Sequence, residues 1–185
     1  MEEKNLRAMR YKAFISYRHL EPDREAAIEL HRALERYVVP ARFRKNGERH
    51  LGRVFRDEDE LPLSANLSDS IRTAINESEF LIVVCSPHFS ESLWCMQEVE
   101  YFLRCHDRDH VLAMLVSGTP RESFPPQLLE DGEGTPCEPL AVNLTGDGNI
   151  SIRRKLKRER LRLAAAMIGK TDYNKFDSWV RGGIS

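Results

Sequence analysis

The segment SLWCMQEVEY, residues 92–101, holds the residue types and spacing that most clearly suggest chemistry. Glu98 follows Trp94 by four residues, and on a helix this spacing places the indole and the carboxylate on one face, one turn apart. An indole offers a flat surface for stacking, and a carboxylate can stabilise positive charge or act as a nucleophile. A structural interpretation competes: Glu98 is then a solvated helix residue like Glu100, and Trp94 packs at a sheet edge.

Polar residues also follow two of the apolar runs, in SYRH at 16–19 and CSPH at 85–88. Arg18 suits a phosphate group, because a guanidinium matches phosphate oxygens bidentately. His19 and His88 are isolated, and isolated histidines are more often structural than catalytic. The four cysteines form no CxxC pair, and the acids of DEDE at 57–60 have no histidine or cysteine nearby. We therefore expect reduced structural thiols and no metal site.

The composition narrows the class of protein. The chain has 185 residues, with 28 Lys and Arg against 29 Asp and Glu and a net charge of −1. This balance argues against nucleic acid as the main partner, because nucleic-acid-binding domains usually carry a clear positive excess. The apolar runs are shorter than the roughly 20 residues that cross a bilayer, and the charged start MEEKNLRAMR is unlike a signal peptide. We expect a cytoplasmic protein without a membrane segment.

Short apolar runs alternate with helical patterns along the chain. We predict strands at 11–17, 52–57, 79–86, 110–116 and 139–144, and the continuously apolar EFLIVVCS at 79–86 should be central and covered on both faces. Helices are expected within 21–38 with Asp23 as N-cap, from Leu67 to Ile75, at about 90–105, and at about 150–168 with Gly169 as the stop.

The last of these predicted helices is strongly basic, in RRKLKRERLR at 153–162. One interpretation is a patch for nucleic acid or acidic lipid. We favour a simpler one, in which Ile152, Leu156, Leu163 and Met167 form the buried face and the charges form the solvated face. That solvated face could also meet another subunit or a neighbouring domain.

The alternation of strands and helices predicts a parallel α/β sheet with helices on both faces, in the five-stranded flavodoxin-like order 2-1-3-4-5. In this order a ligand crevice opens at the carboxyl ends of the first and third strands. Residues 16–19 and 85–88 leave the sheet there, and the latter lead into the helix of Trp94 and Glu98. We divide the chain into an N-terminal extension at 1–10, one domain at 11–169 and a tail or linker at 170–185.

Four segments together resemble the Toll/interleukin-1 receptor (TIR) domain in its bacterial form, over roughly residues 10–170. They are AFISYRH, FRDEDELPLSANLSDSIRTAI, FLIVVCSPHFSESLWCMQEVEYF and RERLRLAAAMIG. The resemblance implies an enzyme that cleaves NAD+ at the nicotinamide–ribose bond, giving ADP-ribose or a cyclic isomer, as a bacterial defence effector. It assigns catalysis to Glu98 and the substrate pocket to Trp94, Phe14, Tyr17, Arg18 and His19.

The resemblance also implies partners. The loop after the second strand, about 57–66, would lie beside the pocket and take part in contacts with other TIR domains, through Asp57, Asp59, Leu61 and Pro62. Family members tend to become active when copies associate, and a further domain or sensor protein is a second expected partner. The chain departs from the family pattern in the longer segment VPARFRKNGERHLG before that strand.

Several other functions compete with NAD+ cleavage. A non-catalytic adaptor that uses only TIR–TIR contacts is the main alternative, although it needs neither Glu98 nor Trp94. A phospho-accepting receiver domain is disfavoured, because SYRH and CSPH stand where its acids would be. A nucleoside deoxyribosyltransferase with a catalytic glutamate stays open. No GxGxxG motif is present, so we expect NAD+ as a substrate and no cofactor.

Overall fold

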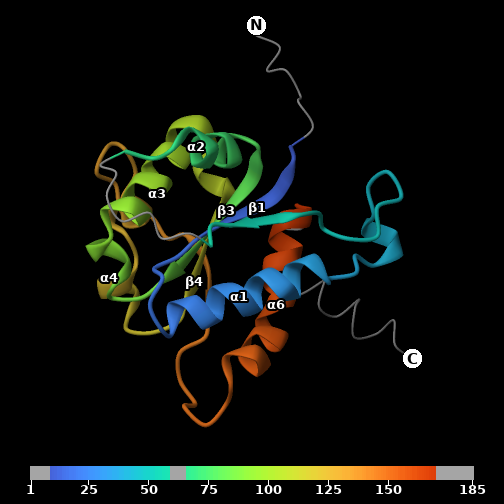
Figure 1. Cartoon of the computed structure of the whole chain (residues 1–185). Helices are drawn as coiled ribbons and strands as arrows, with labels where there is room; N and C mark the ends of the chain where they lie inside the picture. The colour runs from blue at the N-terminus through green and yellow to red at the C-terminus, as the bar shows by residue number, and fades with distance from the viewer. Residues whose placement is uncertain (1–8, 59–65, 170–185) are drawn as a thin grey trace, which may run out of the picture.

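The computed structural model describes residues 9–58 and 66–169, which form a five-stranded sheet with helices on both faces (Figure 1). Every strand pairing is parallel and the order is β2-β1-β3-β4-β5, so the predicted flavodoxin-like topology is confirmed. The strands are β1 (Tyr11–Ser16), β2 (Val54–Arg56), β3 (Ser78–Cys85), β4 (Val111–Leu115) and β5 (Leu140–Asn143).

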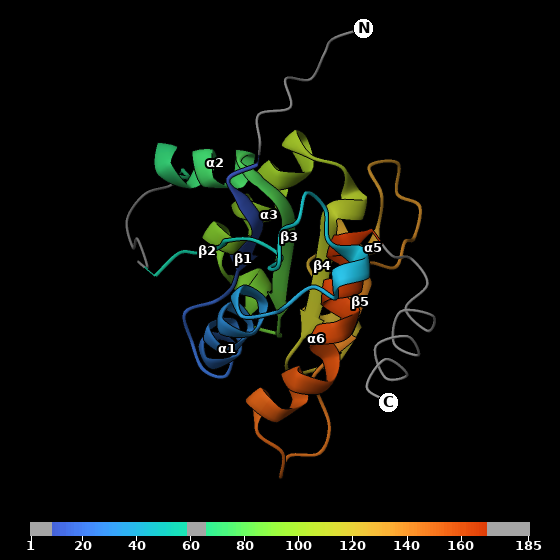
Figure 2. The same ribbon diagram turned by 90° about the vertical axis from the view of Figure 1, so that its right-hand side faces the viewer.

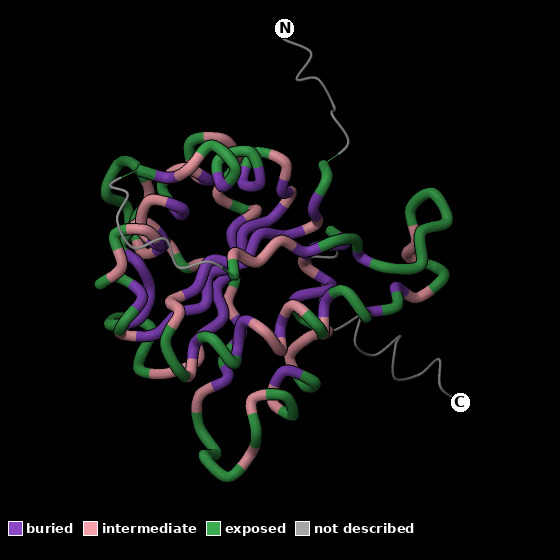
Figure 3. The backbone as a smooth tube through the Cα atoms, viewed as in Figure 1, coloured by how far each residue is buried: buried purple, intermediate pink, exposed green. Residues whose placement is uncertain are grey.

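The sheet is built around β3, which differs by one residue at each end from the apolar run at 79–86 that was predicted to be central. It pairs with β1 on one side and β4 on the other, and its residues 80–85 are all buried. A strand covered on both faces cannot alternate polar and apolar residues, which explains its continuous apolar sequence. The buried strands form the centre of the molecule in Figure 3.

Helices cover the two faces of the sheet in pairs. α1 (Asp23–Glu35) and α6 (Ile152–Ile168) lie together on one face, and α2 (Asp69–Asn76) and α3 (Leu93–Cys105) lie on the other, as Figures 1 and 2 show from two directions. Two short helices, α4 (Pro120–Ser123) and α5 (Pro126–Leu129), interrupt a Pro- and Gly-rich stretch for which we predicted no helix.

Most of the helix ends follow local sequence signals. Ser68, Ser92 and Ser151 are the N-caps of α2, α3 and α6, and each accepts a hydrogen bond from a backbone N–H in the first turn. Gly169 ends α6 in the left-handed conformation, as predicted. The expected cap of α1 was wrong: Pro22 is the N-cap, and Asp23 is the first helical residue.

The alternation of side chains along β1 decides which residues can meet α3. Ala13, Ile15 and Tyr17 pack in the core under α1 and α6, whereas Phe14 packs in the core under α2 and α3. Because alternate residues of a strand face opposite sides of the sheet, Ser16 shares the side of Phe14. Ser16 therefore faces the helix that carries Trp94 and Glu98.

The predicted end segments lie mostly outside the described residues, at 1–8 and 170–185. The longer segment before β2 contains a 3-10 turn (Ala41–Phe43) and an antiparallel bridge from Val38 to His50. Within the described ranges, no helix combines the length and apolar character that a bilayer crossing requires.

Candidate functional site

Glu98 lies on the buried side of α3 with Cys95, Val99 and Phe102. Only 3% of Glu98 is exposed, whereas the nearby Glu100 points to solvent and pairs with Arg104 at 2.6 Å. The solvated interpretation therefore describes Glu100 and not Glu98. A charged residue is rarely buried without a reason, so this carboxyl group is the centre of the candidate site.

The surroundings of Glu98 favour its protonated form. Burial raises the pKa of Glu98 well above its ordinary value of 4.5, and the negative charge of Asp57, which follows β2, raises it further. The Ser16 hydroxyl at the end of β1 lowers this pKa. However, Ser16 Oγ makes no hydrogen bond of acceptable geometry to a described residue, so we treat its effect as weak.

A second buried carboxylate, Asp23, lies at the start of α1 and is 1% exposed. Ser86, directly after β3, donates a hydrogen bond of 2.5 Å to Asp23 Oδ2, whereas Oδ1 has no hydrogen-bond partner among the described residues. Burial raises the pKa of Asp23, although the Ser86 hydrogen bond and the charges of His88 and Arg18 lower it. The helical pattern predicts Asp23 only as a cap, because no local signal links it to a serine 63 residues away.

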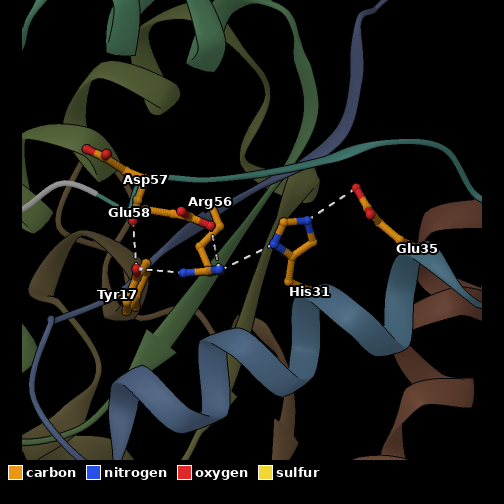
Figure 4. A network of polar contacts seen from close by, with 6 residues as sticks. All are labelled: Tyr17, His31, Glu35, Arg56, Asp57 and Glu58. Atoms are coloured by element: carbon orange, nitrogen blue, oxygen red, sulfur yellow. Dashed lines mark hydrogen bonds and ion pairs between the residues drawn. The ribbon is translucent and has the colours of Figure 1, made fainter.

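A network of polar contacts holds the end of β2 against β1 and α1 (Figure 4). The Arg56 guanidinium donates to Tyr17 Oη at 3.2 Å, to His31 Nδ1 at 3.2 Å and to Glu58 Oε1 at 2.9 Å. Tyr17 Oη in turn donates to the carbonyl oxygen of Asp57 at 2.6 Å.

The same network fixes the tautomer of a histidine. A guanidinium has no acceptor, so His31 Nδ1 must accept from Arg56, and His31 Nε2–H faces Glu35 Oε1 at 3.2 Å. Figure 4 shows the Asp57 carboxylate pointing away from Arg56 and Tyr17. The backbone of Asp57 is thus held by Tyr17, while the charge of its side chain raises the pKa of Glu98. Arg56 and His31 were not among the predicted site residues, because they are 25 residues apart and no local pattern links them.

The residues predicted for the substrate pocket occupy three different environments. Trp94 is half-buried against the core under α2 and α3, one turn before Glu98. Tyr17 is buried, with its ring stacked on His19 at 4.3 Å, and Arg18 acts electrostatically on Asp23 and Cys95. Phe14 is fully buried and stacks on Phe55 at 5.1 Å, which is the environment of a core residue.

The residues predicted for self-association are only partly described. Asp57 has the contacts given above, whereas Asp59, Leu61 and Pro62 lie outside the described residues.

The thiols near the site are poor nucleophiles. Burial raises the pKa of Cys95 to about 12, and the charge of Glu98 raises it further. Burial also raises the pKa of Cys85 far above its ordinary value. The thiolate is the reactive form, so both cysteines are structural. In the described part of the chain, no group of three His, Cys, Asp or Glu side chains could hold a metal ion.

A cavity of about 650 Å³ lies away from Glu98, between β4, β5 and α6. Val111, Leu140 and Ala166 are among its lining residues, and none of the predicted site residues is. Its size alone does not make it the reaction site, because the buried carboxyl groups lie at the other end of the strands.

The family model for the TIR domain matches residues 13–133, from β1 through the site and α5. The chain belongs to the TIR domain family. This match covers more than half of the chain and includes Tyr17, Asp23, Asp57 and Glu98. Helix α6 follows the matched region.

Two curated relatives share parts of this TIR domain. The chain is 41% identical over 110 residues to "NAD(+) hydrolase ApTIR" of Actinoplanes sp., covering 60% of the chain and 14% of that protein. It is 34% identical over 56 residues to "TMV resistance protein N" of Nicotiana glutinosa, covering 30% of the chain and 5% of that protein. The chain thus spans only a small part of each relative.

Among solved structures, the TIR domains of the activated Roq1 resistosome, which directly recognises the pathogen effector XopQ, are similar to this TIR domain. The identity is 26% and the TM-score is 0.46, with 60% of each chain covered.

Proposed function

We propose that this TIR domain hydrolyses NAD+ at the nicotinamide–ribose bond and that Glu98 is the catalytic residue. The observation that carries the proposal is the burial of Glu98 at the carboxyl end of β1, beside Asp57 and one turn after Trp94. The family and the identity of 41% with a protein named an NAD(+) hydrolase support the choice of substrate. The flavodoxin-like fold binds ligands at this end of its strands.

Breaking the glycosidic bond sends the bonding electron pair to the nicotinamide nitrogen, which leaves as a neutral base, and positive charge develops on the ribose. Water then adds to C1′ and releases one proton, so that NAD+ and water yield ADP-ribose, nicotinamide and H+. The ionised Glu98 stabilises the positive charge, and a site with little water strengthens that interaction. Attack by an adenine nitrogen in place of water would give a cyclic ADP-ribose isomer.

The raised pKa of Glu98 is compatible with this role, because the substrate itself is a cation at the reacting ring. A nicotinamide ring bound near Glu98 brings a positive charge that favours the carboxylate form. We assign Trp94 to stacking with the nicotinamide or adenine ring, since a pyridinium is attracted to an aromatic face. Arg18, at the same end of β1, is our candidate for the pyrophosphate.

The burial of Glu98 also favours the second candidate function, a non-catalytic TIR–TIR adaptor. A carboxyl group that is 3% exposed cannot be reached by NAD+ without a local rearrangement.

For the enzyme, we propose that association between TIR domains stabilises the rearranged, competent state, as ligands shift populations between conformations. The loop that starts at Asp57 is our candidate for this contact, because Asp57 already acts on Glu98.

The test is incubation of concentrated protein with NAD+ and chromatographic separation of the products. We expect nicotinamide and ADP-ribose from the wild type, and a loss of about 100-fold or more in Glu98→Gln, since a carboxylate at the reacting charge is worth that much or more. Glu100→Gln is the matched control on the same helix, and it should retain wild-type activity. An inactive wild type would leave the adaptor function as the better explanation, whereas a fully active Glu98→Gln protein would refute the assignment of catalysis to Glu98.

We extend the proposal to a cellular role as a defence effector that consumes NAD+. One relative carries the name of a resistance protein, and the activity proposed above would deplete an essential metabolite. Induced expression in a bacterial host should lower its NAD+ content and arrest growth, whereas Glu98→Gln should do neither. An unchanged NAD+ content with abundant wild-type protein would argue against this role.

A further inference from the structure

A basic groove of about 550 Å³ lies between α1 and α6, on the face of the sheet opposite α3. Residues at 29, 32, 33 and 36 of the α1 side and at 153, 156, 157 and 160 of α6 line it. Both sets repeat every three or four residues, so each forms one ridge along its helix. Leu156, Leu163 and Met167 are buried on one side of α6, and their burial determines which way its basic residues point.

The charges that line this groove are strongly unbalanced. Its charged residues are one acid, Glu29, and five cations, Arg32, Arg36, Arg153, Lys157 and Arg160. Glu29 pairs with Arg32 at 3.1 Å. The other four cations form no ion pair within residues 9–58 and 66–169. Like charges around one hollow repel each other, and a bound anion relieves that repulsion.

We propose that the α1–α6 groove binds a compact anion that carries two or more phosphate groups. The volume lies within the range of about 300–1,000 Å³ that is usual for small-ligand sites. Three of the four cations that form no ion pair with a described residue are arginines, whose guanidinium groups match phosphate oxygens bidentately. A phosphate ester or anhydride also brings more negative charge into a small volume than a carboxylate does.

Two features favour a small polyphosphate over nucleic acid. None of the groove's lining residues is aromatic, so the groove offers no surface on which a base can stack. The chain as a whole has a net charge of −1, which gives little general attraction for a long polyanion. The recognition in this groove is therefore directed at the phosphates.

The groove is distinct from the proposed NAD+ site, because neither Glu98, Asp23 nor any residue of the Arg56 network in Figure 4 lines it. Isothermal titration calorimetry of the whole chain at low salt should show binding of inorganic tripolyphosphate. The affinity should rise in the order phosphate, pyrophosphate, tripolyphosphate, because more charge meets the same four cations. Tripolyphosphate should also raise the melting temperature.

The decisive comparison uses two double variants on α6 with the same change in charge. Arg153→Gln with Lys157→Gln removes groove cations and should weaken tripolyphosphate binding about tenfold or more, because two charge-assisted contacts are lost. Arg154→Gln with Arg158→Gln removes exposed cations that do not line the groove, and it should bind within about twofold of the wild type. Circular dichroism should show that both variants are folded.

Three results would overturn the proposal. The first is a wild type that does not bind tripolyphosphate at low salt. The second is equal weakening in both double variants, which indicates diffuse electrostatic attraction and no defined site. The third is tighter binding of a short oligo-glutamate peptide or a DNA duplex than of tripolyphosphate, which assigns the groove to an acidic protein or to nucleic acid instead.

Discussion

The catalytic role proposed for Glu98 comes with a thermodynamic cost, because a carboxyl group shielded from water is unstable when ionised. Its pKa is raised in the folded state, chiefly by burial and also by Asp57, so the native protein binds this proton more tightly than the unfolded chain. Stability therefore falls as pH rises from the unfolded pKa of about 4.3 through the raised native value.

Glu98→Gln removes this pH dependence while keeping the shape of the side chain. Relative to the wild type, we expect the variant to gain stability between about pH 5 and about pH 8. The gain should be on the order of 1–3 kcal/mol, the usual desolvation penalty of a buried polar group. Denaturant melts of both proteins across this range measure it. The contribution of Asp23 cancels in the difference, and a gain that does not grow with pH would contradict the burial of an ionisable Glu98.

Asp57→Asn tests the charge that acts on Glu98. Without the negative charge of Asp57, the pKa of Glu98 should move down toward its ordinary value. If the carboxylate form is the active one, the acid limb of the pH–rate profile for NAD+ cleavage should shift to lower pH. Asp69→Asn removes the same charge from an exposed position on α2 and should leave the profile in place. A shift toward higher pH in Asp57→Asn would refute the assignment.

The sequence indicated which residues share a helix face, but it was less informative about how deeply each side chain is buried. Glu98 falls on the same face of α3 as Cys95, Val99 and Phe102, and the apolar character of this face indicates that Glu98 is buried. The Asp23–Ser86 pair had no comparable signal, because it joins residues far apart in the chain. Phe14 was expected beside the substrate, but the alternation of β1 and the stacking on Phe55 place it in the core.

At the scale of the elements, β2 is held partly by side chains from outside the strand. It has three residues and pairs with β1 alone at the edge of the sheet. The Arg56 guanidinium connects its end to Tyr17 and His31, and so holds the point from which the chain continues to Asp57.

Arg56→Met keeps an unbranched, apolar stem and removes the guanidinium donors. We expect a loss of stability of about 1–3 kcal/mol, because Arg56 is largely buried and His31 Nδ1 loses its donor. Denaturant unfolding measures the loss. The control, Arg72→Met, alters an exposed arginine that pairs with Asp69 at 3.8 Å, and it should stay within about 0.5 kcal/mol of the wild type. Equal stability in the two variants would show that the network is incidental.

Element types were predictable because periodicity and capping are local. All five strands and the four long helices appear where the apolar patterns placed them, with ends shifted by a few residues. The start of α3 shifted from about 90 to Leu93, because residues 89–91 form a 3-10 turn and Ser92 provides the cap. The short helices α4 and α5 begin at prolines within a stretch that has no periodicity.

At the scale of the whole molecule, the burial of Glu98 makes the activity of a single copy depend on how often it adopts the rearranged state that NAD+ can reach. If association between copies stabilises the competent state, specific activity should rise with protein concentration, or on tethering to an oligomeric scaffold. Activity assays paired with light scattering over the same concentration range test this. A flat specific activity with a monomer throughout would indicate a self-sufficient enzyme. Charge reversal at Asp57 is a poor test of assembly, because it also changes the pKa of Glu98.

The short edge strand β2 has a consequence for amide hydrogen exchange. The N–H of Val54 donates to the Glu35 carboxylate at 3.1 Å, so a side chain and not a neighbouring strand protects this amide. Burial raises the pKa of Glu35, but the hydrogen bonds from Val54 and His31 outweigh it and leave the pKa lowered. The protection factor of Val54 should therefore fall in acid as Glu35 is protonated, while the amides of β3 open only with the whole domain. Exchange at Val54 thus reports the local opening of the short strand that leads to Asp57.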